Sequence, residues 1–394
     1  MIPLETARSR MLEALGPTET VSVEQARADG CTLAAPLIAQ RTQPPFAVSA
    51  MDGYAVHAAD LGATATTLPL AGEAAAGHAL AGALPRGHAA RISTGAPLPA
   101  GADQVVMQER ATRADDHVAL DDTPRPMANI RPAGTDYAAG DTLLEAGQRL
   151  TPEAIALAVG AGETVFAVHR QPRIGILATG DELVEPGETP GPDQIVNSVS
   201  RALAGLISAW DCEPVYLGIA RDTPDSVAAH LDRAEGLDLL VTVGGASVGD
   251  HDHLRAVFTA RGGTLAFERI ALKPGKPTWF GRLGALPCLG LPGNPVSALV
   301  VARLLLAPAA AGLSGRSAIP AFDQARLASD LPANGSRETY LRAGRDEEGR
   351  VAVLDNQDSS ALSALVRADA LIRRPVDAPA ARAGDAVEIL TLTR

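Results

Sequence analysis

The spacing of apolar residues divides the chain into segments with different expected structures. Leu4, Ala7, Met11 and Leu15 recur every three or four residues, which predicts an amphipathic helix at the start. From about residue 42 to residue 141, short β-like runs are separated by Gly, Pro and Asp, a pattern typical of a small β-rich domain. Several structural units are therefore expected.

Further helices are expected around the β-rich segment. Ser22 and Gln25 have the spacing of a capping box, which predicts a second short helix. The run 151–153 (TPE) supplies an N-cap, a first-turn proline and an acid, and so predicts a helix. A strand-like run at 164–168 follows it.

From residue 173 onward, buried strand-like runs alternate with helical patterns. This alternation indicates a parallel sheet covered by helices on both faces. The expected strands are 174–178, 215–219, 239–243, 265–270 and 288–291, and the expected helices are 198–210, 224–234, 253–260 and 295–307. Short strands return after about residue 318 and predict a compact β domain at the end.

The predicted fold class is multidomain α/β plus β. Its parts are a discontinuous helical and extended region, an inserted β-rich domain, a three-layer α/β domain with a mostly parallel sheet, and a C-terminal β-barrel-like domain. The expected bounds are 1–46 with 137–168, 47–136, 169–318 and 319–394 in that order, and part of 21–40 could also belong to the inserted domain.

Composition supports a globular protein with aliphatic cores. Hydrophobic residues make up 46% of the 394 positions, whereas aromatic residues make up only 3%. The three cysteines, Cys31, Cys212 and Cys288, are far apart and form no Cys-x-x-Cys pair. Buried free thiols are therefore expected, rather than a disulfide framework or a thiolate metal site.

The charge balance excludes some classes of partner. A formal net charge of −12 argues against a general nucleic-acid or membrane-surface binder, because both need a cationic face. The N-terminus lacks a basic-then-apolar signal, and the most apolar stretch, 296–313, is broken by Arg303 and Pro308. We expect no membrane partner, no nucleic-acid partner and a cytoplasmic location.

The two lysines of the chain stand together. Lys273 and Lys276 lie within the run 272–278 (LKPGKPT), while every other cationic side chain is arginine. An ammonium is a compact point charge, unlike the planar guanidinium of arginine. The pair therefore favours a site that needs ammonium groups, although a solvated surface pair is the plain alternative.

Three glycine-containing segments follow predicted strands. They are 179–183 (TGDEL), 244–252 (GGASVGDHD) and 290–297 (GLPGNPVS). The carboxyl ends of parallel strands, where loops meet helix N-termini, are where such sheets bind ligands, and anions in particular. None of the segments matches the dinucleotide fingerprint or the P-loop, and each alone could be a tight strand-to-helix turn.

Carboxylates beside these turns suit phosphate together with Mg²⁺. Asp181, Glu182, Asp250 and Asp252 could carry the metal, although helix capping explains Asp250 almost as well. Adjacent residues in the run 250–253 (DHDH) rarely converge on one tetrahedral ion, so zinc is disfavoured.

Six motifs give the chain a family resemblance. They are 45–55 (PFAVSAMDGYA), 92–97 (ISTGAP), 129–131 (NIR), 179–183 (TGDEL), 273–277 (KPGKP) and 291–297 (LPGNPVS). In this order they resemble the molybdopterin molybdenumtransferase family, which includes the E domain of gephyrin. The resemblance implies the last step of molybdenum cofactor synthesis, in which adenylylated molybdopterin and molybdate react, with Mg²⁺, to give the cofactor and AMP.

The resemblance also assigns roles to residues. It implies catalytic roles for Asp52, Glu182, Asp252, Lys273 and Lys276, and metal binding by Glu182, Asp252 and Asp52. The expected substrate-binding residues are Thr94, Arg131, Asp136, Asp222, Gly245, Ser247, Pro292, Asn294, Pro295, Ser297, Arg337 and Ser360. Asp136 and Asp222 could instead cap turns, and Arg131 could form a surface salt bridge.

The family architecture implies an elongated homodimer. The discontinuous region would dimerise, and the active cleft would lie between the α/β domain of one subunit and the inserted domain of its partner, so that Asp52 acts in trans. A molybdopterin adenylyltransferase and molybdoenzyme maturation factors are the implied protein partners. The chain departs from the family at 356–360 (NQDSS), which lacks a glycine after Gln357, and at His253, where an aromatic residue is common.

Two other functions compete with this assignment. A molybdopterin adenylyltransferase would use a related sheet domain, but it would leave the inserted and C-terminal domains unexplained. A carrier or scaffold would bind the finished cofactor without catalysis and would release no AMP.

Overall fold

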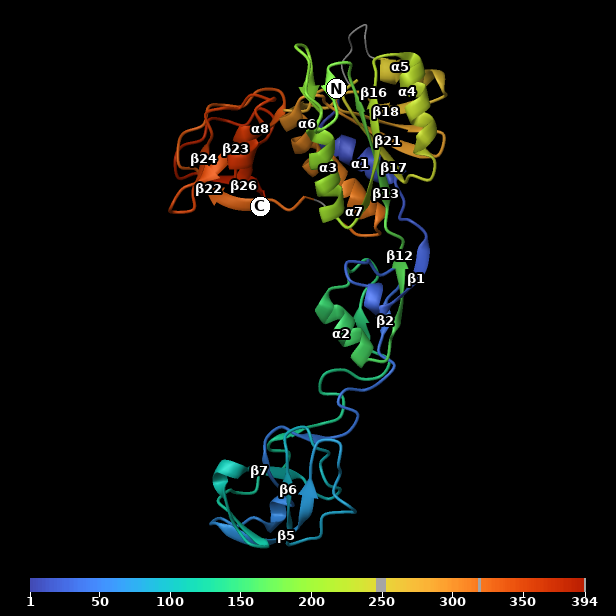
Figure 1. Ribbon diagram of the computed structural model, residues 1–394. Helices are drawn as coiled ribbons and strands as arrows, with labels where there is room; N and C mark the ends of the chain where they lie inside the picture. Colours follow the sequence, from blue (N-terminus) through green and yellow to red (C-terminus); the bar gives the residue numbers. More distant parts are fainter. Residues whose placement is uncertain (246–252, 318–319, 393–394) are drawn as a thin grey trace.

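The computed structural model describes residues 1–245, 253–317 and 320–392. Figure 1 shows an elongated molecule in which an α/β domain and the C-terminal β domain lie side by side at one end. The inserted β domain lies at the other end, and a slender middle region joins the two. The predicted combination of several domains with mixed α/β sheets is confirmed at this level.

The α/β domain is built on a six-stranded sheet with the order β16-β13-β17-β21-β20-β18. Its first four strands are parallel, whereas β20 runs antiparallel to both of its neighbours. The strands are β13 (Arg173–Thr179), β16 (Glu213–Ala220), β17 (Leu239–Val243), β18 (Thr264–Phe267), β20 (Trp279–Leu283) and β21 (Leu286–Leu291).

Strand β20 was missed by the sequence analysis, and the predicted strand 265–270 ends early, at Phe267. Leu283 pairs with Leu286, so β20 and β21 are joined by a two-residue turn at Gly284 and Ala285. Gly284 has a φ of +60°, which such hairpin turns require. The Gly-Ala pair at 284–285 could therefore have indicated a hairpin from the sequence alone.

Helices cover both faces of this sheet, so the domain has three layers. Figure 1 shows α4 and α5 on one side and α1, α3, α6 and α7 on the other. The elements are α1 (Leu4–Ala14), α3 (Val199–Ala209), α4 (Pro224–Leu231) with a 3₁₀ turn (Asp232–Ala234), α5 (His253–Ala260), α6 (Pro295–Val301), a π-helical segment (Ala302–Leu306) and α7 (Ala307–Leu313). The four helices predicted here are present, and the last one extends beyond residue 307.

Helix α1 corrects one predicted bound. Leu4, Ala7 and Met11 are buried, as their spacing predicts, but they belong to the same hydrophobic core as the α/β sheet and α7. The start of the segment 1–46 therefore belongs to the α/β domain rather than to the region that contains 137–168. The apolar face of α1 packs against α7 and β18 of that domain.

The middle region consists of paired segments from before and after the inserted domain. Its elements are β1 (Thr20–Glu24) paired with β12 (Val165–His169), a 3₁₀ turn (Gln25–Arg27), β2 (Leu37–Ile38) paired with β11 (Thr142–Leu144), and α2 (Pro152–Gly160). Thr151 caps α2 as predicted, because its hydroxyl accepts a hydrogen bond from the Ala154 amide at 3.2 Å. The capping box at Ser22 was a wrong prediction, since Ser22 pairs with Ala167 inside β1.

The inserted domain has a six-stranded sheet with the order β7-β4-β6-β5-β9-β8. A small two-stranded sheet, β3 with β10, lies beside it. The elements are β3 (Val48–Ser49), β4 (Gly53–Val56), β5 (Thr66–Ala74), β6 (Ala89–Ile92), β7 (Gln104–Met107), β8 (Ala111–Ala114), β9 (His117–Leu120), β10 (Ile130–Arg131) and 3₁₀ turns at Ala58–Asp60 and Gln108–Arg110.

The C-terminal domain has a sheet that includes a strand from the lysine segment. Its strands are β19 (Leu272–Lys273), β22 (Asp323–Arg326), β23 (Glu338–Arg345), β24 (Val351–Val353), β25 (Ala370–Arg374) and β26 (Ala386–Thr391), accompanied by α8 (Leu362–Arg367). The short β19 pairs in parallel with the start of β23. The α/β and C-terminal domains are thus joined through hydrogen-bonded backbone.

One helical stretch among the described residues, Pro295–Leu313, is long and apolar enough to cross a membrane. Within the fold, 83% of its apolar window is buried. Leu299, Leu304 and Leu305 lie in the same core as the sheet, so the apolar composition of this stretch is explained by packing.

Replacing Met11 by Ala tests the placement of α1. Met11 is fully buried, so its truncation should lower the free energy of unfolding of the α/β domain by about 2–5 kcal/mol. Both tryptophans, Trp210 and Trp279, lie in this domain, so tryptophan fluorescence during urea unfolding reports on it. The exposed Met51 of the inserted domain gives a matched Met→Ala control that should leave this transition unchanged. Equal midpoints for the two variants would contradict the placement.

Candidate active site

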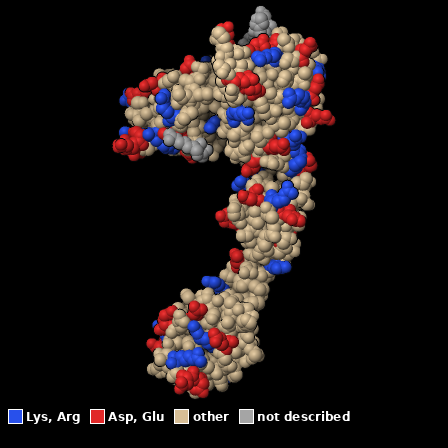
Figure 2. Space-filling model, in the orientation of Figure 1, with Lys and Arg blue, Asp and Glu red and all other residues tan. Residues whose placement is uncertain are grey.

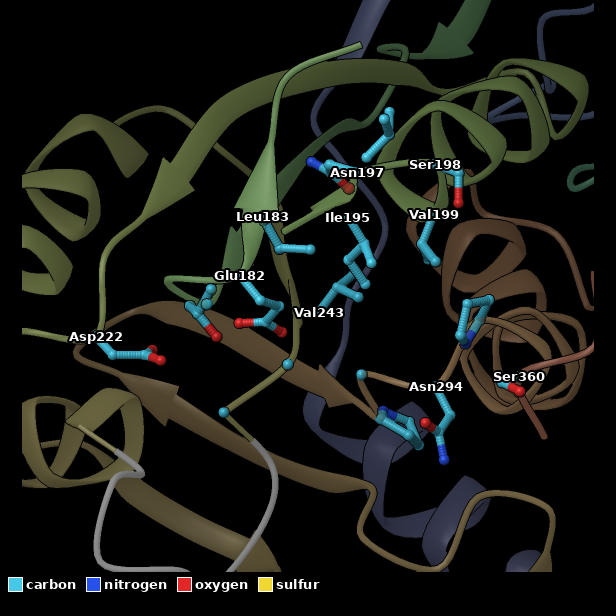
Figure 3. Close-up of a pocket in the computed structure, with 18 of the residues that line it drawn as sticks. Glu182, Leu183, Ile195, Asn197, Ser198, Val199, Asp222, Val243, Asn294 and Ser360 are labelled. Atoms are coloured by element: carbon cyan, nitrogen blue, oxygen red, sulfur yellow. The ribbon is translucent and has the colours of Figure 1, made fainter. Parts of the chain in front are cut away.

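A cavity of about 820 Å³ lies at the carboxyl ends of β13, β17 and β21 (Figure 3). The turns after these strands, which the sequence analysis singled out, therefore meet at one place. The lining includes seven of the predicted residues, namely Glu182, Asp222, Gly245, Pro292, Asn294, Pro295 and Ser360. This size suits a ligand much larger than a single phosphate.

Two carboxylates, Glu182 and Asp222, form one wall of the cavity. Asp222 accepts a hydrogen bond from the Asp181 amide at 3.4 Å, and Asp181 accepts one from the Asp222 amide at 3.2 Å. The turn after β13 and the turn after β16 are locked together by this exchange. Asp222 thus caps a turn, which was the alternative to a substrate-binding role, and it also lines the cavity.

The floor of the cavity holds a buried hydroxyl without a partner. Thr179 is 5% exposed, and its Oγ1 makes no hydrogen bond within the described structure. Gly244 and Gly245 pass directly beside it in left-handed conformations, with φ of +89° and +57°. A Cβ at Gly244 would lie 2.6 Å from the Thr179 carbonyl oxygen. These glycines let the backbone pass close to Thr179 at the floor of the cavity. Because the Thr179 hydroxyl has no hydrogen-bond partner among the described residues, it is available to a polar ligand.

The opposite side is formed by the start of α6 and a loop of the C-terminal domain. Asn294 occupies the N-cap position, but its side chain makes no cap hydrogen bond and instead donates to Ser359 Oγ at 2.9 Å. The Val296 amide donates to the Ser359 carbonyl at 3.0 Å, and Ser360 lines the cavity. The segment 356–360 is therefore part of the site, even though its sequence departs from the family pattern.

Arg342 holds this loop in place. It is 1% exposed, and its Nη2 donates to the carbonyls of Asn356 and Asp358 at 3.0 and 3.1 Å. Burial lowers the pKa of its guanidinium, an effect that Asp358 opposes. The sequence analysis missed Arg342, because nothing in an arginine-rich chain distinguishes one buried arginine from an exposed one.

The two lysines are not part of the cavity lining, but the segment that carries them reaches it. Both are exposed, and Pro277, which follows Lys276, lines the cavity. Leu272 and Lys273 pair with Glu338 and Thr339 at the start of β23. Arg337, which was predicted to bind substrate, directly precedes this strand. Ser297 does not join them, because it is buried within α6, at 4% exposure, and lies off the cavity lining.

A second group of predicted residues lies on the inserted domain. Asp52 accepts a hydrogen bond from the Thr94 amide at 2.7 Å, and this amide, followed by the Thr94 hydroxyl, lowers the pKa of Asp52. Arg131 pairs with Val48, close in sequence to Asp52, and is exposed. Asp136 lies in a turn where its amide donates to the Gln43 carbonyl.

These two groups are not brought together within one chain. Asp52 directly precedes β4, which pairs with β6 and β7 in the inserted domain, and Figure 1 shows that domain at the opposite end of the molecule from β13, β17 and β21. Asp252 and Ser247 lie outside the described residues, as does Asp250. Among the described residues, no three His, Cys, Asp or Glu side chains form a metal-binding group. Figure 2 shows basic and acidic side chains interspersed over the visible face.

Family models match almost the whole chain. "MoeA N-terminal region (domain I and II)" matches residues 2–162, "Probable molybdopterin binding domain" matches 175–312, and "MoeA C-terminal region (domain IV)" matches 324–392. A protein from Haemophilus influenzae named molybdopterin molybdenumtransferase is 36% identical, over 99% of this chain and 98% of its own length. The chain belongs to the molybdopterin molybdenumtransferase family.

Other members of the molybdopterin molybdenumtransferase family agree with this assignment. A Mycobacterium tuberculosis protein named molybdopterin molybdenumtransferase 2 is 34% identical, over 98% of this chain and 97% of its own length. The crystal structure of a molybdopterin biosynthesis MoeA protein from Pyrococcus horikoshii matches with a TM-score of 0.86 at 27% identity, covering 100% of both chains. The cavity lies in the segment matched by the molybdopterin-binding model, with Ser360 added from the C-terminal domain.

The site also contains residues to which the sequence analysis assigned no role. Leu183, Ile195, Val196 and Asn197 line the cavity, from a small parallel sheet of β14 (Leu183–Val184) with β15 (Ile195–Val196) and the residue after it. Their two-residue strands are too short to produce a periodic pattern. The run of Gly and Pro between them was the one available signal of a protruding loop.

Replacing Gly275 by Ala tests how firmly the lysine segment is seated. A Cβ there would lie 2.5 Å from Val301 Cγ2, and the φ of +126° is unfavourable for Ala. Gly284 also has a positive φ, of +60°, but open space surrounds it, so Gly284→Ala is the matched control. Overpacking should make Gly275→Ala about 1–3 kcal/mol more destabilising than Gly284→Ala in urea unfolding. Equal losses would show that the segment is loosely held.

Proposed function

We propose that this protein inserts molybdenum from molybdate into adenylylated molybdopterin and releases AMP. The observation that carries the proposal is the cavity itself. Except for Ser360, its lining lies within the region matched by the molybdopterin-binding model, and it combines carboxylates, glycine turns and a buried hydroxyl that has no hydrogen-bond partner among the described residues. This combination suits a large ligand with an anionic end.

The reaction couples cleavage of a phosphoanhydride to metal insertion. Water adds to one phosphorus and the bridging oxygen leaves with the other phosphate, which gives AMP and the phosphate monoester of molybdopterin. The two thiols of molybdopterin bond to the molybdenum of molybdate and give their protons to one of its oxygens, which leaves as water, so that the molybdenum cofactor results without any change of oxidation state. Positioning and charge stabilisation supply most of the catalysis in such reactions, because the protein forms no covalent bond to the phosphate. The turns after β13 and β17 and the start of α6 line the cavity, so a substrate phosphate bound there would lie against their backbone.

The donor set also suits Mg²⁺. Glu182 and Asp222 present carboxylate oxygens to the same cavity, and Mg²⁺ commonly uses one or two protein carboxylates together with water and substrate phosphates. When bound, the metal would offset negative charge on the phosphate oxygens. Asp252, also proposed as a ligand, would have to come from outside the described residues.

Lys273 and Lys276 are proposed to bind molybdate, the oxyanion substrate of the reaction. Molybdate is a tetrahedral dianion, and an ammonium group matches a near-spherical anion without a planar fit. Both side chains are exposed, on a segment packed firmly against the core through Gly275. Arg337 and Ser360 come from the C-terminal domain, the first directly before the strand that pairs with the lysine segment and the second in the cavity lining.

We also propose that the complete site forms in a homodimer, with Asp52 and Thr94 supplied by the partner subunit. Support comes from their own geometry. The pair is assembled and exposed on the inserted domain, yet it lies far from the cavity of its own chain. A second copy can supply what one elongated chain cannot.

AMP release tests the reaction. Purified protein with adenylylated molybdopterin and Mg²⁺ should release AMP in a molybdate-dependent manner, and Lys276→Ala should reduce the rate roughly 100-fold, as loss of one positioned charge often does. Arg113→Ala, which changes an exposed cation on the inserted domain, should leave the rate unchanged. Absence of AMP under every condition would favour a carrier, and ATP consumption with unmodified molybdopterin would favour an adenylyltransferase.

Mixing two inactive variants tests the action of Asp52 in trans. Asp52→Ala and Lys276→Ala subunits that exchange freely form heterodimers in about half of all dimers, and each heterodimer contains one intact site of two. About a quarter of wild-type AMP release should therefore return. A mixture that stays inactive after verified subunit exchange would refute a shared site.

A further inference from the structure

The cavity has an apolar side that the phosphate and metal chemistry does not use. Leu183 and Ile195 are register partners in the parallel pair β14 and β15, and both line the cavity beside Val199 and Val243. Figure 3 shows Leu183 and Ile195 next to each other between Glu182 and Val199, with Asp222 beyond Glu182. Polar and apolar surfaces thus occupy different parts of one cavity.

Ile195 is the most exposed residue of this apolar side. It is 58% exposed and its neighbour Val196 is 39% exposed, whereas Val199 and Val243, which also line the cavity, are only 6% and 4% exposed. A single exposed isoleucine on a protein surface needs no explanation. Here, however, it lines a cavity that also contains two carboxylates and the buried Thr179 hydroxyl, which has no hydrogen-bond partner within residues 1–245, 253–317 and 320–392, so polar and apolar surfaces face the same space.

One tyrosine bonds to both ends of the segment that carries Ile195, in addition to the backbone hydrogen bonds of that segment. We call residues 183–196, from β14 through β15, the flap. The Tyr216 hydroxyl donates to Glu185 Oε1 at 2.8 Å and accepts from Asn197 Nδ2 at 3.0 Å, so it ties the ends of both flap strands to β16. Asn197 Oδ1 also accepts from the Ser200 amide, at 3.3 Å, in the first turn of α3.

This anchoring leaves the apolar side chain in a defined position. The Ile195 amide donates to the Glu182 carbonyl at 2.7 Å, so the apolar surface is fixed beside the carboxylate wall by the backbone itself. Such an arrangement suits a ligand with a charged group at one end and a flat apolar ring at the other. Aliphatic side chains pack well against the faces of such rings.

We propose that Ile195, supported by Leu183, is the packing surface for a flat heterocyclic ring of the substrate, and that Tyr216 is the residue that positions it. The proposal rests on the proposed function, whose substrate contains two such rings, the adenine of its AMP part and the pterin. The shared chemistry is a planar heterocycle. Phosphate would be bound elsewhere in the cavity, beside the turns and a Mg²⁺ ion that Glu182 and Asp222 would hold.

Binding measurements with three probes identify the ring. AMP and ribose 5-phosphate share a phosphate monoester and differ by the adenine, and 6-hydroxymethylpterin supplies a pterin without phosphate. Ile195→Ser should weaken binding of one ring-bearing probe about tenfold, since lost apolar contact in a pocket has effects of this size. Weaker AMP binding with unchanged ribose 5-phosphate binding assigns the flap to adenine, and weaker pterin binding assigns it to the pterin.

Control variants separate packing from folding. Ile195→Leu keeps an apolar surface and should retain affinity, and Val376→Ser removes a comparably exposed apolar group, at 46% exposure, outside the cavity. Tyr216→Phe removes only the hydroxyl. It should weaken the ring-bearing probe while ribose 5-phosphate binding stays at the wild-type level, a split that general loss of structure would not produce.

The proposal has clear contrary outcomes. Unchanged affinity of Ile195→Ser for both AMP and 6-hydroxymethylpterin would overturn it, even if molybdate-dependent AMP release stands. A change in the oligomeric mass of Ile195→Ser would reassign the side chain to a subunit interface and also overturn it. Because these assays involve no turnover, failure of the proposed reaction is detected separately, by the absence of AMP release.

Discussion

The candidate active site depends on the parallel alignment of β13, β17 and β21. Parallel neighbours end at the same edge of a sheet, so the turns that follow them must share one space. Glycine at 244 and 245 then lets the backbone pass within contact distance of Thr179, where any larger side chain would collide. The cavity thus results from the common direction of the strands and from the absence of side chains at these glycines. Of its two carboxylates, Glu182 lies in the turn after β13 and Asp222 in the turn after β16, the parallel neighbour of β13.

A different physical problem arises at the scale of the whole chain. The inserted domain is connected through paired strands, β1 with β12 and β2 with β11, so its residues are carried away from the sheet. Asp52 and Thr94 form a finished hydrogen-bonded unit there, independent of the cavity. The chain therefore has two separately assembled groups of polar residues, and the proposed homodimer gives a reason for both to exist.

Sequence patterns predicted the elements whose residues repeat over several turns or strands. The face of α1, the N-cap at Thr151 and the central strands of the sheet were of this kind. The failures came where partners distant in sequence decide the structure. Strand β20 forms because it pairs with β21 in a hairpin. Ser297 is buried on α6 rather than exposed to the cavity. Arg342 contributes to the site by holding the loop that begins at residue 356. Ile195 lies on a strand too short to show any period.

Strand β19 has a consequence for how the protein can move. Lys273 belongs by sequence to the α/β domain, yet its backbone is hydrogen-bonded into the C-terminal sheet through β23. The Asn294 side chain likewise reaches across to Ser359. A hinge between these two domains would have to break a β ladder, so thermal fluctuations should displace them as one rigid block. The lysine segment pairs with the C-terminal sheet and packs on the α/β core through Gly275, so it should keep its position relative to both domains.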